Sequence, residues 1–178
     1  AMCGSCPPGV PFDFYGRIIE ISRRNECKTL LDASGKHLVE SIKHRPYIVK
    51  PNQFELSQIL GRPVKSIEDT CNGAIEVTKE YGIEIVVVTL GSNGCLATDG
   101  YSIWRAIPPK IELASSVGSG DSFASGLIYA LENKQSLQDA IRLATAAGTA
   151  NAATFGAGFC SLESIMKLFE TVIVKQVV

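Results

Sequence analysis

Four apolar residues, three of them valine, stand in succession near the middle of the chain as Ile85-Val86-Val87-Val88. Successive side chains of a strand point to opposite faces of its sheet, so a strand of this composition is apolar on both faces. Strands of that kind occur in parallel sheets, where the connecting helices cover both faces. The run therefore predicts a buried strand in a parallel α/β sheet.

The segments before this strand alternate between the patterns of strands and helices. Short apolar runs bounded by turn residues indicate strands, apolar residues three or four positions apart indicate helices, and Pro51 ends the strand before it. Ser66 and Asp69 have the spacing of a capping box. Strands are expected at 2–4, 28–32 and 47–49, and helices from Phe14, around 37–42, from about Asn52, and from Ser66 to about Tyr81.

The second half of the chain predicts a hairpin and three helices. Asp99-Gly100 is well suited to a two-residue turn, because both of its positions need positive φ, and it joins runs 95–98 and 101–106 into an antiparallel edge hairpin. Helical patterns follow around Phe123, from Ser136 to Ala153, and at 162–169, before a last apolar run at 172–174. Since the chain has no repeat or linker, residues 1–178 are expected to be one domain or part of one.

Composition argues against several classes of protein. The formal net charge is -1, with 17 basic and 18 acidic residues interspersed, so no charged field exists to hold nucleic acid or an anionic membrane. No apolar run approaches the roughly 20 residues that span a bilayer, and Ala1 to Pro11 do not resemble a secretory leader, so a cytoplasmic location is expected. Among the six cysteines only Cys3 and Cys6 have ligand-like spacing, and no second pair faces them. Because a zinc site usually needs about four ligands, a zinc or redox role for this pair is disfavoured.

The motif with the clearest chemistry is Val117-Gly118-Ser119-Gly120-Asp121, a glycine-rich turn that leads into an amphipathic helix. The glycines allow unusual dihedrals and close approach of a ligand, and the free N–H groups of the helix start attract an anion. Asp121 could accept the proton of a hydroxyl that attacks a phosphate at this turn. Alternatively, Asp121 only complements the dipole of an ordinary helix.

Lys50-Pro51-Asn52-Gln53-Phe54-Glu55 follows a predicted strand directly. Asn52 and Glu55 lie three positions apart, hence on one face of the first helical turn. Their oxygens suit Mg²⁺ held through its waters, and Lys50 could neutralise phosphate charge. An Asn N-cap with Glu at the third helical position explains the same residues without a metal.

Thr89-Leu90-Gly91-Ser92-Asn93-Gly94 leaves the buried strand at the edge where ligands of open α/β sheets collect. Glycines there permit close approach of phosphate, and Thr89 offers a hydroxyl, although a tight turn into the hairpin accounts for the segment equally well. The chain contains neither a P-loop motif nor G-x-G-x-x-G, which disfavours a P-loop enzyme and a dinucleotide-binding fold.

Together, and in this order, these motifs resemble the ribokinase-like (PfkB) carbohydrate kinases over nearly the whole chain. The early loop Cys3 to Pro11 and the segment Leu31-Asp32-Ala33-Ser34-Gly35 are similar to the branch that contains 1-phosphofructokinase and tagatose-6-phosphate kinase. The resemblance implies an α/β fold with a mostly parallel sheet, flanked by helices and carrying an edge hairpin. It also implies that residues 1–178 are the C-terminal nucleotide-binding and catalytic portion, without the N-terminal part and the lid.

The resemblance assigns a role to each motif. Asp121 becomes the catalytic base, and Gly118, Ser119 and Gly120 form the anion hole. Asn52 and Glu55 are assigned to positions near Mg²⁺. The residues assigned to face ATP are Lys50, Thr89, Gly91 and Gly94. Asn151 is placed near the adenosine, and Ser5 beside the sugar phosphate. For Asn151, a structural bond to a nearby loop is an equal alternative, and Cys6 departs from the aliphatic residue usual in its loop.

The function expected from the sequence is ATP- and Mg²⁺-dependent phosphorylation of a ketohexose monophosphate, first of all fructose 1-phosphate, by a protein that is homo-oligomeric when complete. Tagatose 6-phosphate is the nearest alternative substrate, and a ribokinase or nucleoside kinase would share Asp121 and the anion hole. From another class, a nucleotide-binding fragment without activity stays open.

Overall fold

The computed structural model describes residues 1–177, which form two compact units. Unit 1 comprises residues 1–90 and 96–103, and unit 2 comprises residues 91–95 and the chain from Trp104 onward. The seven strands follow one another in the sheet in the order of the sequence, β1-β2-β3-β4-β5-β6-β7. This α/β architecture, with a mostly parallel sheet flanked by helices, agrees with the fold class that the sequence predicts.

Unit 1 contains the parallel strands that the apolar runs predict. Met2 of β1 pairs with Leu31 of β2, Leu31 with Val49 of β3, and Val49 with Val86 of β4, so the four strands run in one direction. A helix follows each of the first three strands, as parallel connections require. The elements are β1 (Met2–Cys3), α1 (Phe14–Arg24), β2 (Leu30–Asp32), α2 (Gly35–Ser41), η1 (Ile42–His44), β3 (Ile48–Val49), α3 (Gln53–Leu60), α4 (Ile67–Tyr81) and β4 (Ile85–Thr89).

The core of unit 1 explains why these short strands hold together. Val86, Val87 and Val88 of β4 are fully buried, as expected for a strand that is apolar on both faces. Leu38 of α2 and Val77 of α4 are also fully buried, and each such side chain contributes roughly 1.5–3 kcal/mol of transfer free energy.

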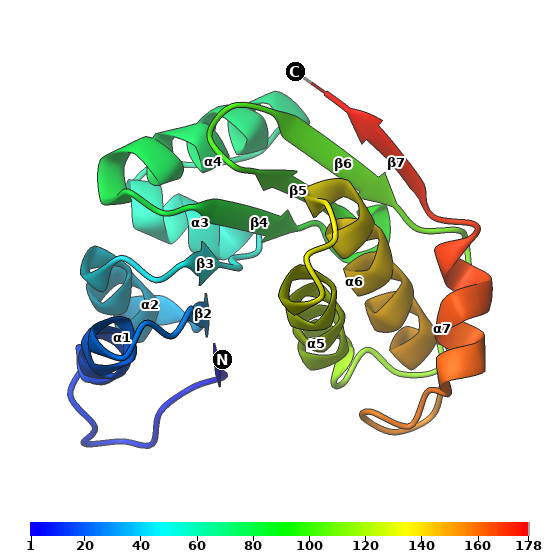
Figure 1. Cartoon of the computed structure of the whole chain (residues 1–178), viewed down its shortest axis with the longest axis horizontal. Helices are drawn as coiled ribbons and strands as arrows, with labels where there is room; N and C mark the ends of the chain where they lie inside the picture. Colours follow the sequence, from blue (N-terminus) through cyan, green and yellow to red (C-terminus); the bar gives the residue numbers. More distant parts are fainter. Residues whose placement is uncertain (178) are drawn as a thin grey trace. The chain divides into compact units, whose positions relative to one another are not determined.

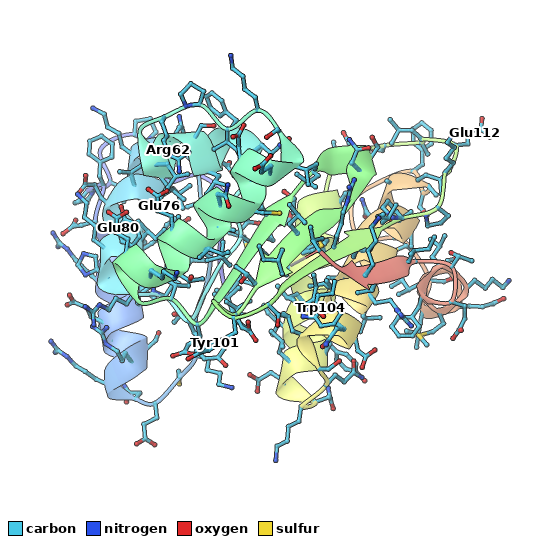
Figure 2. All side chains as sticks on the ribbon, turned by 90° about the horizontal axis from the view of Figure 1, so that it is seen from above. Arg62, Glu76, Glu80, Tyr101, Trp104 and Glu112 are labelled. Carbon is cyan, nitrogen blue, oxygen red and sulfur yellow. The ribbon has the colours of Figure 1, made fainter. Side chains whose placement is uncertain are left out.

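Helices α3 and α4 begin and end at local signals in the sequence. Ser66 accepts a hydrogen bond from the Asp69 N–H, and the Asp69 carboxylate accepts one from the Ser66 N–H, which forms the predicted capping box. Between the two helices, Arg62 forms an ion pair with Glu76 of α4 (Figure 2).

The connection between β5 (Cys95–Thr98) and β6 (Ile103–Ile107) differs from the predicted two-residue turn. Four residues, 99–102, join the strands, because the Asp99 carboxylate accepts hydrogen bonds from the N–H groups of Tyr101 and Ser102 and closes a wider loop. Although burial opposes it, these two N–H groups hold the pKa of Asp99 below its ordinary value. Gly100 supplies the positive φ, at +89°.

Unit 2 contains α5 (Ser119–Glu132), α6 (Leu137–Ala152), α7 (Leu162–Phe169) and β7 (Ile173–Gln176). Helix α6 lies beside α5 on one side and α7 on the other (Figure 1). A Cβ on Gly126 of α5 would lie 3.1 Å from the Ala144 Cα atom, so the small residues allow the two backbones to approach closely.

Strand β7 pairs antiparallel with β6, with Trp104 opposite Gln176 and Ile107 opposite Ile173. The sequence places the hairpin at the edge of the sheet, whereas the structure adds β7 outside it. Within residues 1–177, no helix combines the length and the apolar character that crossing a membrane requires.

Candidate functional site

The turn before α5 is built to leave backbone N–H groups open. Gly118 is the N-cap residue of α5 and has no side chain, so no side-chain hydrogen bond caps the helix. The N–H of Ser119 donates to the Ser116 carbonyl and that of Ser122 to the Gly118 carbonyl, which leaves the first-turn N–H groups of Gly120 and Asp121 for an anion. The positive end of the helix dipole lies behind them.

Gly118 is required at its position for two reasons. Its φ is +79°, which is unfavourable for residues with a Cβ atom, and a Cβ built there would lie 2.6 Å from the Ala157 Cβ. Gly120, by contrast, lies inside the first turn of α5, so the unusual dihedral expected at both glycines occurs at Gly118.

Asp121 projects from this first turn and is exposed. Together with Gly118 it lines a cavity of about 870 Å³ within unit 2. Most of the lining comes from helices α5, α6 and α7, including Tyr129, Leu143, Met166 and Phe169. An exposed carboxylate beside uncapped N–H groups can accept a proton next to a bound anion.

Asn151, near the C-terminal end of α6, is fully buried. Its Nδ2 group donates to the Val117 carbonyl at 2.8 Å and to the Ser119 hydroxyl at 3.1 Å. Its Oδ1 atom accepts from the Gly158 N–H at 2.7 Å. The structure thus brings Asn151 to the glycine-rich turn, with its amide bonded to nearby loops.

A second group of predicted residues lies in unit 1, where strands β2 and β3 end. Lys50 follows β3, and its side chain is only 5% exposed. Its Nζ atom lies 2.8 Å from the Asp32 Oδ2 atom at the end of β2, and the Asp32 side chain is 18% exposed. Asp32 was not among the site residues predicted from the sequence, although a charged residue directly after each of two parallel apolar runs was a usable signal.

Asn52 and Glu55 form a complete capping box at the start of α3. Asn52 Oδ1 accepts from the Glu55 N–H at 2.9 Å, and Glu55 Oε2 accepts from the Asn52 N–H at 2.8 Å. Burial is the main reason that the pKa of Glu55 lies above its ordinary value. The hydrogen bond from the Asn52 N–H and the charge of Lys50 lower the pKa in part. The box uses one carboxylate oxygen and leaves Oε1 outside it, so the donor set fits a water-mediated Mg²⁺ contact as well as a helix cap.

Thr89 lies next to this pair through backbone contacts. It forms a parallel bridge with Asn52, and its N–H donates to the Pro51 carbonyl at 2.9 Å. Unit 1 therefore brings Lys50, Asn52, Glu55 and Thr89 together at the carboxyl ends of its strands.

The two predicted glycines after β4 belong to unit 2 and differ in their surroundings. Gly91 begins the short helix η2 (Gly91–Asn93), and a Cβ there would meet no atom within 4 Å. At Gly94, with φ +86°, a Cβ would lie 1.9 Å from the Ala106 carbonyl oxygen. The packing of the hairpin alone therefore requires Gly94.

Ser5 is exposed on the loop after β1 in unit 1. The preceding N–H, of Gly4, donates to the Asp32 carbonyl at 2.9 Å, so the loop begins beside the end of β2. Tyr15 of α1 lies near the same loop, where burial, followed by a hydrogen bond with Cys6, raises its pKa to about 12.

Solved structures of kinases resemble this chain closely. The phosphofructokinase-2 from Escherichia coli in complex with potassium is 30% identical, with a TM-score of 0.88 over 94% of this chain and 54% of that chain. A phosphofructokinase described as putative, from Staphylococcus aureus, is 27% identical, with a TM-score of 0.89 over 98% of this chain and 56% of its own.

The ribokinase of Arabidopsis thaliana complexed with ribose and ATP shares the fold, at 20% identity and a TM-score of 0.78, over 93% of this chain and 55% of that chain. The chain thus spans little more than half the length of these structures. The family model described as pfkB family carbohydrate kinase matches residues 1–165. With that match over most of its residues, the chain belongs to the pfkB family of carbohydrate kinases.

Proposed function

We propose that the complete protein transfers the γ-phosphoryl group of ATP to a hydroxyl of a ketohexose monophosphate. The observation that carries the proposal is the start of α5, where Gly118 leaves the N–H groups of the first turn uncapped beside the exposed Asp121. Phosphoryl transfer needs positioning and charge stabilisation more than covalent chemistry, and both can come from such a turn.

Within this proposal, Asp121 accepts the proton of the attacking hydroxyl. Of the predicted anion hole Gly118-Ser119-Gly120, the Ser119 N–H is already bonded, so the free N–H groups of Gly120 and Asp121 hold the phosphoryl group as negative charge develops on its oxygens. The charge of the helix dipole is fixed before the reaction begins, so this stabilisation requires no rearrangement of the turn.

The residues of unit 1 are proposed to act on the nucleotide and its metal. Lys50, already held by Asp32, neutralises phosphate charge, and Thr89 offers its hydroxyl to ATP, with Gly91 and Gly94 as the other residues proposed to face the nucleotide. Asn52 and Glu55 are the residues that would hold Mg²⁺, which would supply positive charge beside the phosphates. The ribokinase that shares this fold was solved with ATP, which supports ATP as the donor.

Fructose 1-phosphate is the first proposed acceptor, on the resemblance of the loop around Ser5. Fructose 6-phosphate is the second candidate, because the Escherichia coli phosphofructokinase-2 was also solved in complex with fructose-6-phosphate. Tagatose 6-phosphate stays a third. The same enzyme was solved as a tetrameric inhibited form, which supports a homo-oligomeric complete protein.

The experiment is a substrate panel on the complete protein that measures ADP release with ATP and Mg²⁺. Fructose 1-phosphate, fructose 6-phosphate, tagatose 6-phosphate, ribose and adenosine are compared by kcat/KM. We expect the highest value for a ketohexose monophosphate. A preference for ribose or adenosine would contradict the substrate class, and no turnover with any acceptor would favour a nucleotide-binding protein without activity.

A further inference from the structure

The side-chain amide of Asn151 forms all of its hydrogen bonds with other groups of the protein. It has two N–H donors, and they reach the Val117 carbonyl and the Ser119 hydroxyl, while its oxygen accepts from the Gly158 N–H. A carbonyl can only accept and a backbone N–H can only donate, so these partners fix which side of the amide is nitrogen. Both donors of this fully buried side chain are therefore used within unit 2.

The three partners of Asn151 come from two segments, the glycine-rich turn and the loop that follows α6. Val117 and Ser119 lie on either side of Gly118, and Gly158 lies in the loop that follows α6. That loop packs directly on the turn, since a Cβ on Gly118 would lie 2.6 Å from the Ala157 Cβ. The Asn151 side chain is therefore hydrogen-bonded both to the glycine-rich turn and to the loop that packs on it.

The end of α6 holds the other side of the turn as well. The Ala152 carbonyl, one residue after Asn151, accepts hydrogen bonds from the N–H groups of Ala114 and Ser115. The loop that enters the turn is therefore attached to α6 at Ala152, and the turn itself is attached at Asn151. This arrangement limits the directions in which the first N–H groups of α5 can point.

We propose that Asn151 is a positioning residue for phosphate binding, which fixes the turn from Val117 to Ser119 so that the α5 N–H groups face the phosphates. Asn151 itself makes no contact with the nucleotide. The inference rests on the proposed function, because it assigns the turn to the phosphates of ATP, and it replaces the contact with adenosine that the family resemblance implies for Asn151.

The change Asn151→Asp tests this role. Aspartate has nearly the same shape, but it cannot donate to the Val117 carbonyl, and it adds a negative charge behind the turn. Phosphate binding should weaken while binding of the nucleoside should not. We expect the Kd for ATP to rise about tenfold or more and the Kd for adenosine to change less than twofold, because a buried carbonyl loses its donor.

Both constants are measured on the complete protein with Mg²⁺ by calorimetry, together with kcat and the KM for ATP. Thr149→Val is the matched control, because the Thr149 hydroxyl donates within α6, to the Thr145 carbonyl, and lies outside the turn. It should leave both Kd values within twofold of the wild type.

Two results would overturn the inference. An equal loss of ATP and adenosine affinity in Asn151→Asp would show that Asn151 contacts the nucleoside, and unchanged affinity for both would show that the turn does not depend on it. If Asn151→Asp does not fold, Ser119→Ala removes one of the same hydrogen bonds, and it should weaken ATP selectively by a smaller factor. A normal ratio of the two Kd values in that variant counts against the inference.

The outcome also separates the inference from the proposed function. If the wild-type protein binds ATP no better than adenosine, the turn holds no phosphate and both fail. If the wild type prefers ATP and the variants keep that preference, only the role of Asn151 fails.

Discussion

Replacing Asp32 by asparagine should destabilise the protein more than any other loss of a single ion pair described above. Asp32→Asn keeps the size and a hydrogen-bond acceptor but removes the charge that faces Lys50. The Lys50 ammonium, 2.8 Å from the Asp32 carboxylate, would then remain in a site where its side chain is only 5% exposed. A buried charge without its partner is far more costly than the pair was favourable.

The expected cost follows from this burial. Removing one partner of a buried ion pair destabilises a protein by about 3–5 kcal/mol. Because the Asp32 side chain keeps 18% of its exposure, water can partly solvate the site, and we expect the low end, about 3 kcal/mol. The double variant Asp32→Asn/Lys50→Met removes both charges, so its free energy of unfolding should return to within about 1 kcal/mol of the wild type.

Urea unfolding of the complete protein measures these differences. Glu163→Gln is the matched control, because Glu163 and Lys167 form a pair at 2.7 Å whose side chains are 77% and 75% exposed. Such an exposed pair is worth about 0–1 kcal/mol. If Asp32→Asn costs no more than Glu163→Gln, or if Lys50→Met fails to restore stability in the double variant, the pair is not desolvated and the reasoning is wrong.

Three further predictions concern the metal, the hairpin and the length of the chain. Glu55→Gln should raise the Mg²⁺ concentration needed for half-maximal rate. Burial raises the pKa of Glu55 above 4.5, so the stability of the wild type falls as pH rises from about 4.5 through the raised pKa. The variant lacks this carboxyl group, so its stability relative to the wild type should be higher at neutral pH than in mild acid. In thermal or urea unfolding, Gly94→Ala should cost about 3 kcal/mol or more, against about 1 kcal/mol for Gly91→Ala, because only the Gly94 Cβ meets backbone, at 1.9 Å from the Ala106 oxygen. Residues 1–178 alone should associate and show no turnover, because they lack the N-terminal part and the lid that the family resemblance implies, and positioning a reactant is worth roughly 7–11 kcal/mol.

Each of the three has an opposing outcome. An unchanged Mg²⁺ requirement with a sharp loss of stability in Glu55→Gln would favour the helix cap over the metal role. Equal losses at Gly94 and Gly91 would mean that the hairpin can move away from the new methyl group. A monomeric chain of residues 1–178 with the turnover of the complete protein would show that the additional length is dispensable.

The sequence predicted those elements whose signals are local. Helix α7 has the predicted bounds, 162–169, because Ser161 caps it through the Ser164 N–H and its apolar residues repeat at helical spacing. The capping box of Asn52 and Glu55 is equally local, since both partners lie within one turn. The buried parallel strand was predicted at Ile85 to Val88, within the observed Ile85–Thr89, because a run that is apolar on both faces fits only a buried strand.

Features that depend on distant partners escaped prediction. The ion pair of Lys50 with Asp32 forms because β2 and β3 are neighbouring strands in the sheet. The residues near Lys50 in the sequence do not indicate which strand lies next to β3. The three hydrogen bonds of Asn151 join residues up to 34 positions apart, and the sequence predicted a bond to a nearby loop only as an equal alternative to contact with adenosine. The turn at Asp99-Gly100 was misassigned because the same carboxylate that suits a two-residue turn can also close a four-residue loop.

The central claim is that Asp121 accepts a proton in phosphoryl transfer, rather than simply complementing the dipole of α5. Asp139 provides a matched control, because it is also an aspartate in the first turn of a helix of unit 2, where it bonds to the N-cap residue Ser136. A carboxylate that only complements a dipole should behave alike at both positions.

The decisive measurement is kcat and the Kd for ATP in the complete protein for Asp121→Asn and Asp139→Asn. We predict that Asp121→Asn lowers kcat by roughly 10²–10⁴-fold with the Kd for ATP nearly unchanged, because the base is lost and the turn remains. Asp139→Asn should keep kcat within about twofold and cost only about 0.3–1 kcal/mol of stability. Near-normal turnover in a folded Asp121→Asn protein, with both variants behaving alike, would contradict the account.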